Sequence, residues 1–209
     1  MDHILSVVLF TPLIGFLVLF FIPSSNGKAI KLWANFISLA GFLVSLPLVF
    51  QFDRTKDFQF AERCTWIPTI GASYSLAIDG FSLLLVVMTT LLGFLSILSS
   101  WNAITDRLKE YYANFLILQV GMLGVFMATD FLLFFVFWEL VLVPMYFIIA
   151  IWGGARRYYA AIKFIIYTLI GSVLMLLGIL TMYSHHFSQT HTYTFEIAEL
   201  MKTSMPAGM

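Results

Sequence analysis

Long apolar runs with very few charged residues constrain this chain more than any other feature of its sequence. Six runs are long enough to cross a membrane core, which needs about 20 helical residues, and they lie near residues 4–22, 31–50, 81–101, 112–129, 131–152 and 162–183. Polar and apolar residues do not alternate within them, which excludes a membrane β-barrel. Helices are then the way to satisfy the backbone in lipid. The sequence predicts an all-α, polytopic transmembrane helix bundle of about six spans.

Composition excludes several classes of protein. Of 209 residues, 61% are hydrophobic, and eleven basic residues balance eleven acidic ones. A chain with no net charge offers no basic surface, so we expect no nucleic-acid partner. It has one cysteine, Cys64, and no glycine-rich nucleotide-binding motif. His185, His186 and His191 do not follow a known ligand spacing, so we expect neither a metal site nor a cofactor in this chain.

The basic residues predict how the spans are oriented. Loops on the inner side of a membrane carry an excess of Lys and Arg. Seven basic residues adjoin the first, third and fifth connections, against four on the other side: Lys28, Lys31, Arg107, Lys109, Arg156, Arg157 and Lys163, against Arg54, Lys56, Arg63 and Lys202. We therefore expect the N-terminus to lie outside, with the first apolar run a true span and not a signal peptide.

Two segments stand apart from the spans in the predicted organisation. Residues 1–183 form the helical bundle, and within it residues 51–80 carry turn signals and short alternating pieces that indicate a hairpin on the outer surface. Residues 184–209 form a polar connecting tail with a short amphipathic piece at residues 195–201. Because such a tail resembles a connection to a further segment, we expect the chain to be part of a longer one.

Helix caps and packing faces are also predicted. Asp79 and Asp130 each precede a span, where a short acid accepts hydrogen bonds from free helix N–H groups. Small residues recur on single helix faces, which lets neighbouring helices approach closely. We expect these faces to be buried in the bundle: Gly121, Gly124 and Ala128 on the fourth span, and Gly171 and Gly178 on the sixth.

Glu139 is the one ionisable residue that lies well inside a span, in the run FFVFWELVLVPMYFIIAIW. A charge at a helix centre costs about 2.5–3.5 kcal/mol on insertion scales, and such residues commonly mark ion pathways. Nine residues of helix after Asp130 place the carboxyl about 13 Å deep, near the bilayer midplane. Desolvation favours the neutral acid and a nearby cation favours the ionised one, as in a proton switch. The alternative is a structural hydrogen bond to a neighbouring helix.

Two residues near Glu139 bear on its surroundings. Pro144 has no N–H, so the carbonyl of Leu140 loses its helical donor beside the buried acid. That carbonyl is either a site for ordered water or part of a kink that only shapes packing. Trp138 adjoins Glu139, away from the membrane surfaces where tryptophans gather. Both residues are predicted to support the site.

Lys163 begins the sixth span, and its side chain either snorkels to the inner surface or turns inward. Glu139 lies about 18 Å from the inner end of its own span, so a direct ion pair with Lys163 requires bending or water. Lys163 is a candidate for a later station on a proton path.

Four stretches resemble subunit M (chain 4) of bacterial NADH-quinone oxidoreductase, respiratory complex I. They are PLIGF, WIPTIGASYSLAIDGFSLLLVVMTTLL, EYYANFLILQVGMLGVFMATDFLLFFVFWELVLVPMYFIIAIWGG and YAAIKFIIYTLIGS. The run FVFWELVLVPMY, with Trp138, Glu139 and Pro144 in register, is the most specific of them. Related antiporter-like subunits and multisubunit sodium/proton antiporters share the glutamate.

The resemblance implies an antiporter-like, proton-translocating subunit of about fourteen spans, of which this chain holds the N-terminal part. It carries the fifth-helix glutamate onto Glu139, whose lysine partner stands in a seventh helix that this chain does not include. It further implies other membrane-arm subunits as partners, a bacterial inner membrane, and NADH, FMN, iron–sulfur clusters and quinone bound elsewhere in the complex. The alternatives are a sodium/proton antiporter subunit and a non-catalytic membrane scaffold.

Overall fold

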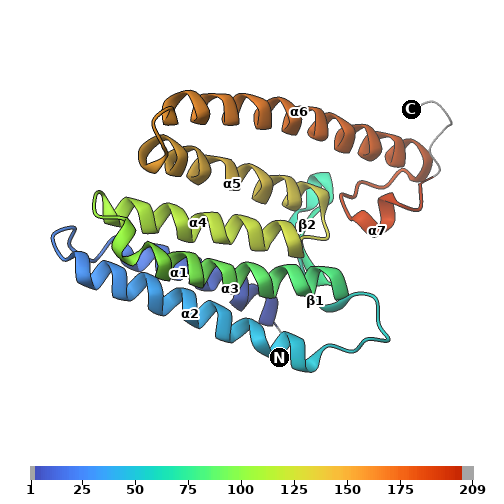
Figure 1. Cartoon of the computed structure of the whole chain (residues 1–209). Coiled ribbons are helices and arrows are strands. Elements are labelled where there is room, and N and C mark those ends of the chain that lie inside the picture. The colour runs from blue at the N-terminus through green and yellow to red at the C-terminus, as the bar shows by residue number, and fades with distance from the viewer. Residues whose placement is uncertain (1–2, 204–209) are drawn as a thin grey trace.

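Six helices lie side by side in the computed structural model, which describes residues 3–203 (Figure 1). They are α1 (Ile4–Leu19), α2 (Gly27–Gln51), α3 (Gly80–Ala103), α4 (Leu108–Met127), α5 (Phe131–Trp152) and α6 (Arg157–Thr190). Consecutive helices run in opposite directions, so α1, α3 and α5 all begin where the strands lie (Figure 1). We call this the hairpin end of the bundle and the other end the loop end.

The predicted helical membrane fold is confirmed. Five helices are long and apolar enough to cross a membrane, and α1, with 16 residues, is shorter. The largest difference from the predicted spans is at α6, which runs from Arg157 through Thr190 and thus includes residues 184–190 of the predicted tail. The polar residues of this segment stay helical because they continue an uninterrupted helix that contains neither proline nor an internal cap.

A two-stranded antiparallel sheet, β1 (Gln59–Ile67) and β2 (Ala72–Ile78), lies within the segment predicted to hold a hairpin. The 3-10 turn Pro68–Ile70 and Gly71 join the strands, and Gly71 has a left-handed φ of 70°. A Cβ there would lie 2.0 Å from the carbonyl oxygen of Tyr193, so the turn requires glycine for both reasons. β2 contacts the ends of α1, α3, α4 and α5, which makes the hairpin a common platform for the helices.

The segment after α6 folds back onto this platform. Phe131 donates its N–H to the carbonyl of Phe195 at 2.8 Å, and Ile197 donates to that of Thr129 at 3.0 Å. Thr129 in turn donates to Ser75 of β2 at 3.0 Å. The connection between α4 and α5 therefore lies between β2 and residues 195–197, and the short helix α7 (Ile197–Leu200) follows.

Carboxylates accept hydrogen bonds from the first turns of all three helices that begin at the hairpin end. The predicted caps are confirmed: Asp79 accepts from the amide of Ser82 in α3 at 2.7 Å, and Asp130 accepts from two amides of α5. The first turn of α1 is capped by Glu62 of β1, whose carboxylate accepts from the amides of Leu5 and Ser6. The positive end of each helix dipole also stabilises a negative group at this position.

Cations bind the carbonyl groups at the opposite ends of the same three helices. Lys109 donates to the carbonyls of Phe20 and Ile22 after α1, each at 3.0 Å. Lys31 donates to the carbonyl of Trp101 in α3 at 2.5 Å, and Arg157 donates to that of Ile151 in α5 at 2.6 Å. These residues were predicted from their charge to mark one side of the membrane. In the structure they also donate hydrogen bonds to the free carbonyl groups at helix C-termini, where the negative end of the helix dipole stabilises a cation.

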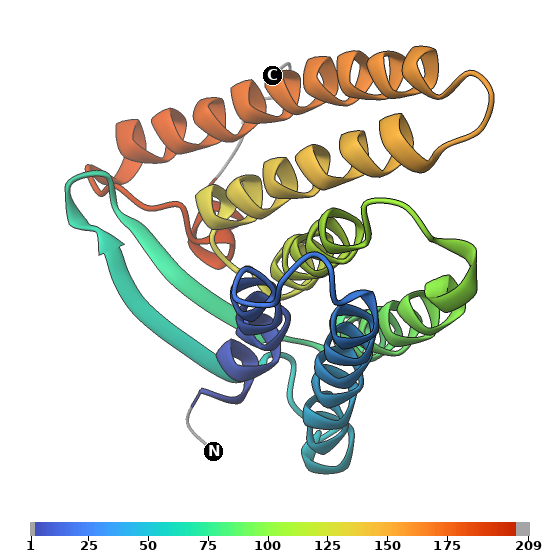
Figure 2. The same cartoon turned by 90° about the vertical axis from the view of Figure 1, so that its left-hand side faces the viewer.

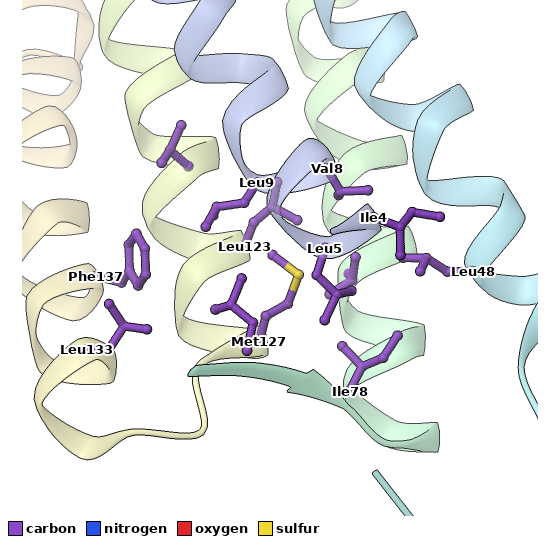
Figure 3. Packing of buried hydrophobic residues seen from close by; sticks show 13 residues of the cluster. Ile4, Leu5, Val8, Leu9, Leu48, Ile78, Leu123, Met127, Leu133 and Phe137 are labelled. Atoms are coloured by element: carbon purple, nitrogen blue, oxygen red, sulfur yellow. The ribbon is translucent and has the colours of Figure 1, made fainter. Parts of the chain in front are cut away.

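The core joins the platform to the helices. At the hairpin end, buried side chains of α1, α4 and α5 meet those of β2; Leu5, Leu123, Met127, Phe137 and Ile78 belong to this cluster (Figure 3). The cluster fixes the start of α5 against α4.

Glycine sets how closely α4 and α5 approach. A Cβ at Gly124 would lie 2.2–2.4 Å from ring carbons of Phe137, and one at Gly121 would lie 2.7 Å from Cγ2 of Val141. The predicted burial of these two positions is confirmed, whereas Ala128 lies just beyond the end of α4.

The predicted burial of Gly171 and Gly178 was wrong. Nothing lies within 4 Å of a Cβ at either position, because both belong to the open side of α6. α6 packs against α5 at the edge of the bundle (Figure 2). Small residues at helical spacing indicate a surface that can be approached closely, but they do not say that the approaching helix lies in the same chain.

Overpacking at the α4–α5 contact should destabilise the fold. We expect Gly124→Ala to lower the free energy of unfolding by about 1–3 kcal/mol, because the Phe137 ring must move. The measurement is chemical unfolding of the purified, membrane-extracted protein. Gly154→Ala is the matched control, since a Cβ at Gly154 has no neighbour within 4 Å. Equal losses in the two variants would contradict the packing argument.

The α3 cap should depend on pH. Hydrogen bonds from the hydroxyl and the amide of Ser82 hold the pKa of Asp79 below its ordinary value of 3.8. A lowered folded pKa means that the cap stabilises the fold fully above pH about 4 and loses this effect as the pH falls through the folded value. We expect Asp79→Ala to cost about 1 kcal/mol at pH 7 and progressively less in stronger acid. Unfolding across this pH range, with Asp57→Ala as control, tests it; a pH-independent difference would contradict it.

Candidate functional site

Glu139 lies in the middle of α5, eight residues after its first residue and thirteen before its last. A rise of 1.5 Å per residue places its Cα about 12 Å from the hairpin end of the helix and about 20 Å from the loop end. It is partly buried within the chain, and its Oε1 atom is shielded from solvent without a hydrogen-bond partner among residues 3–203. A buried carboxyl oxygen without a partner costs free energy. No hydrogen bond of this oxygen within residues 3–203 therefore explains why an acid stands inside the helix.

The side of α5 that bears Glu139 follows from helix geometry. Residues 132, 135, 139 and 142 form one stripe, since residues three or four apart share a face. Leu132 and Phe135 of this stripe pack against a cluster that includes Met175 and Ile179 of α6. Phe137, which packs against α4, lies about 160° around the helix from Glu139. Glu139 therefore belongs to the α6-facing stripe.

Pro144 and Trp138 lie on other sides of the same helix. α5 continues as helix through Pro144, which is buried. Since proline has no N–H, the carbonyl of Leu140 has no i+4 donor, one residue after Glu139. Trp138 is 39% exposed, and its ring stacks on Phe134 with centroids 5.9 Å apart. These contacts place Trp138 on an outer face of α5.

The structure does not bring Lys163 to Glu139. Buried positions on α6 include Ala161, Ser172, Ile179 and His186, which share one stripe. Lys163 lies about 200° around the helix from Ala161, and it is exposed. Its Nζ lies 5.8 Å from the ring centroids of both Tyr159 and Tyr167, one helical turn to either side. Glu139 therefore faces the side of α6 that packs against α5, whereas Lys163 lies on the other side of α6. There Lys163 lies between the rings of Tyr159 and Tyr167.

The beginning of α5 is fixed by a buried carboxylate. Asp130 is fully buried, and one oxygen accepts from the amides of Leu132 and Leu133 at 2.9 and 3.1 Å. The other oxygen accepts from the amide and the hydroxyl of Ser73 in β2, at 2.9 and 3.1 Å. The hairpin thus fixes the position at which α5 starts, and with it the depth of Glu139.

The sequence reasoning missed Gln119, since it considered only ionisable groups inside the spans. Gln119 is fully buried in α4, and both atoms of its amide have no hydrogen-bond partner in the described chain. Gly93 of α3 makes room for it, because a Cβ there would lie 2.8–3.2 Å from the amide atoms. One turn away on α3, Thr90 shares a hydrogen bond of 2.9 Å with Ser45 of α2. A glycine opposite a polar residue in two apolar runs was the signal available in the sequence.

His186, one of the three histidines considered for a metal, serves the fold. It is buried at the end of α6, and its Nδ1 lies 2.7 Å from the hydroxyl of Thr203. Residues 3–203 contain no group of three or more side chains arranged to hold a metal ion.

Comparison with known proteins shows what the chain is similar to. Residues 128–207, which include Glu139, Pro144 and Lys163, match the family model described as NADH:quinone oxidoreductase/Mrp antiporter, TM. Over 188 residues the chain is 44% identical to NADH-quinone oxidoreductase subunit M of Rhodobacter capsulatus, covering 88% of this chain and 36% of that one. The resemblance to NADH-quinone oxidoreductase subunit M is confirmed over most of the chain.

A second relative agrees with this match, and a solved structure has the same fold. The chain is 45% identical over 175 residues to NADH-ubiquinone oxidoreductase chain 4 of Chondrus crispus, covering 83% of this chain and 36% of that one. Its fold superposes on a chain of respiratory complex I from Thermus thermophilus with a TM-score of 0.80 at 23% identity, covering 98% of this chain and 40% of that one. The chain is a multi-pass membrane protein that spans about two fifths of the length of these relatives.

Removing the buried cap of α5 should destabilise the region around Glu139. We expect Asp130→Ala to cost about 3 kcal/mol, because several buried donors lose their acceptor and each costs roughly 1–3 kcal/mol. Hydrogen exchange of the α5 amides in the purified protein measures this locally. Asp57→Ala, at an exposed position of the hairpin segment, is the control. Unchanged protection of α5 in Asp130→Ala would contradict the assigned role.

Proposed function

We propose that this chain forms part of a proton-translocating membrane subunit of an NADH-quinone oxidoreductase, in which Glu139 carries the proton. One observation carries the proposal: a carboxyl lies inside an apolar helix long enough to cross a membrane, and one of its oxygens is buried without a partner among residues 3–203. The capping carboxylates Glu62, Asp79 and Asp130 lie at the hairpin end and are bound to helix amides. Glu139 is the acid that lies well inside a predicted span.

The proton switch follows from the surroundings of Glu139. Burial favours the protonated carboxyl, whereas a cation brought close favours the carboxylate, which then releases its proton. When the cation withdraws, the carboxylate takes up a proton from the side to which it is then connected. Ordered water at the carbonyl of Leu140, freed by Pro144, would supply a route for that proton.

The cation belongs to another part of the protein. The family resemblance implies a lysine in a seventh helix as the partner of Glu139. Lys163 is then an onward station, since its ammonium group lies on the open side of α6 between Tyr159 and Tyr167. Pro144 and Trp138 support the site from α5, by the freed carbonyl and by packing.

Electron transfer is assigned to other subunits. NADH, FMN, iron–sulfur clusters and quinone bind there, and this chain couples to them through its contacts with other membrane-arm subunits. The Lys and Arg distribution orients the N-terminus and the hairpin end to the outside of a bacterial inner membrane. Redox-driven movement of charge in neighbouring subunits would then set the state of Glu139.

A sodium/proton antiporter subunit is the second candidate function, because the matching family model names Mrp antiporters as well as NADH:quinone oxidoreductase. Both candidates use the same buried acid. They differ in whether electron transfer or a sodium gradient drives the proton. The third alternative, a membrane scaffold, gives Glu139 no role in transport.

Substitution of Glu139 in the assembled complex tests the proposal. Glu139→Gln keeps the shape and polarity of the side chain but removes its titration, so we expect most proton translocation per electron to be lost while the complex still assembles. Proton uptake in inverted vesicles during NADH oxidation measures this. Glu199→Gln is the control, since Glu199 is an exposed acid beyond the last long helix, paired with Lys202.

The outcomes separate the three functions. Unchanged proton translocation per electron in Glu139→Gln would refute the central proposal. Sodium-dependent proton movement in vesicles without NADH or quinone would favour the antiporter. Loss of assembly in Glu139→Ala, with normal activity per assembled complex, would favour the scaffold.

A further inference from the structure

A groove at the loop end has charged residues at its rim and apolar residues in its floor. Its volume is about 340 Å³, within the usual range of ligand pockets, about 300–1,000 Å³. It lies where the last turns of α1 and α5 meet the first turns of α4. Charged residues at the start of α4 lie at its rim, among them Arg107, Lys109 and Glu110, and apolar side chains form its floor, among them Phe20, Phe147 and Ile151.

Two cations at the rim are held in place by bonds that leave donors free. The guanidinium of Arg107 binds the carboxylate of Glu110 through Nε and Nη2, and Nη1 has no partner in the described chain. Lys109 uses two of its three N–H groups for the carbonyls of Phe20 and Ile22. One Nη1 group and one ammonium hydrogen therefore remain for an acceptor in the groove.

The charge at this end favours an anion. Arg157 adds a third cation, because it binds the carbonyl of Ile151, which lines the groove. Glu110 and Asp106 are the acids beside the groove, and Glu110 is paired with Arg107. Three cations against two acids leave the rim positive. Cations near a membrane surface attract anionic lipid headgroups.

The floor of the groove extends from the rim into the depth of the membrane. Phe147 lies five residues before the last residue of α5, which corresponds to about 7.5 Å along the helix. Its side chain is 41% exposed, and Phe20 is 61% exposed. Free phosphate would leave this apolar floor uncovered, whereas an acyl chain below a phosphate would cover it.

We propose that the groove binds one anionic phospholipid, with its phosphate at Arg107 and Lys109 and an acyl chain along Phe20, Phe147 and Ile151. The lipid would lie against the ends of α1 and α5 and the start of α4. This site is separate from Glu139 and does not depend on the proposed transport function.

Lipid titration of the complete, assembled complex tests the site. The complex is stripped of lipid in detergent and titrated with phosphatidylglycerol or with phosphatidylcholine of the same acyl chains, and bound lipid is counted by native mass spectrometry. We expect Arg107→Gln to weaken binding of one phosphatidylglycerol about fivefold, the effect of one cation near a membrane surface. Lys28→Gln, an exposed cation at the same end but outside the groove, should leave it unchanged.

A second variant and a cryo-electron density map test the same proposal independently. Phe147→Ala removes part of the floor without changing charge, so it should weaken both lipids at this site. A cryo-electron density map should place a phosphate within hydrogen-bond distance of Arg107 and Lys109. Equal losses in Arg107→Gln and Lys28→Gln, equal binding of the two lipids in the groove, inorganic phosphate alone at the rim, or a side chain of another subunit in the groove would each overturn the proposal.

Discussion

Helix ends are the places where a membrane bundle must satisfy backbone groups that its helices leave unpaired, and this fold does so with charge at both ends of three helices. Glu62, Asp79 and Asp130 accept from the first turns of α1, α3 and α5. Basic residues bind the carbonyls at the far ends of the same helices: Lys109, Lys31 and Arg157. The arrangement follows the helix dipole, and it fixes the depth of each helix relative to the hairpin.

The position of Glu139 depends on that arrangement. Asp130 and Arg157 hold the two ends of α5, and Gly121 and Gly124 allow its middle to pack closely against α4. Such a helix has little freedom to slide, so its acid stays near the midplane. Its stripe faces α6 and not α4. In the proposed function, proton exchange therefore depends on changes around Glu139, since the helix that bears this residue is held at both ends.

Local patterns in the sequence predicted much of this fold. The apolar runs gave the helices, and the caps at Asp79 and Asp130 involve residues two or three positions away, so short spacing was sufficient. Contacts between distant segments could not be read in this way. Glu62 accepts from the amide of Leu5, 57 residues earlier in the sequence, and nothing in the tail indicated that residues 195–197 pair with the connection between α4 and α5. Gly171 and Gly178 show the converse limit, since their spacing indicated packing without indicating the partner.

Part of the candidate site could also be predicted from the sequence. The depth of Glu139 follows from its place in an apolar run, whereas the helix that its side of α5 faces follows from contacts between α5 and α6. The outward direction of Lys163 depends on which side of α6 meets α5, which residues of α6 alone do not determine. Gln119 carries no charge, yet it is buried as deeply as any side chain in the bundle. A neutral amide gives a weaker signal than an acid, although the physical cost of burying it is real.

Infrared difference spectroscopy of the assembled complex during redox turnover tests the central claim most directly, because it observes protonation of a carboxyl group. If Glu139 carries the proton, the wild-type protein should show a carboxyl C=O band that changes between reduced and oxidised states and shifts on exchange into D₂O. That band should be missing in Glu139→Gln. The same band at full intensity in Glu139→Gln would contradict the assignment of proton transfer to Glu139.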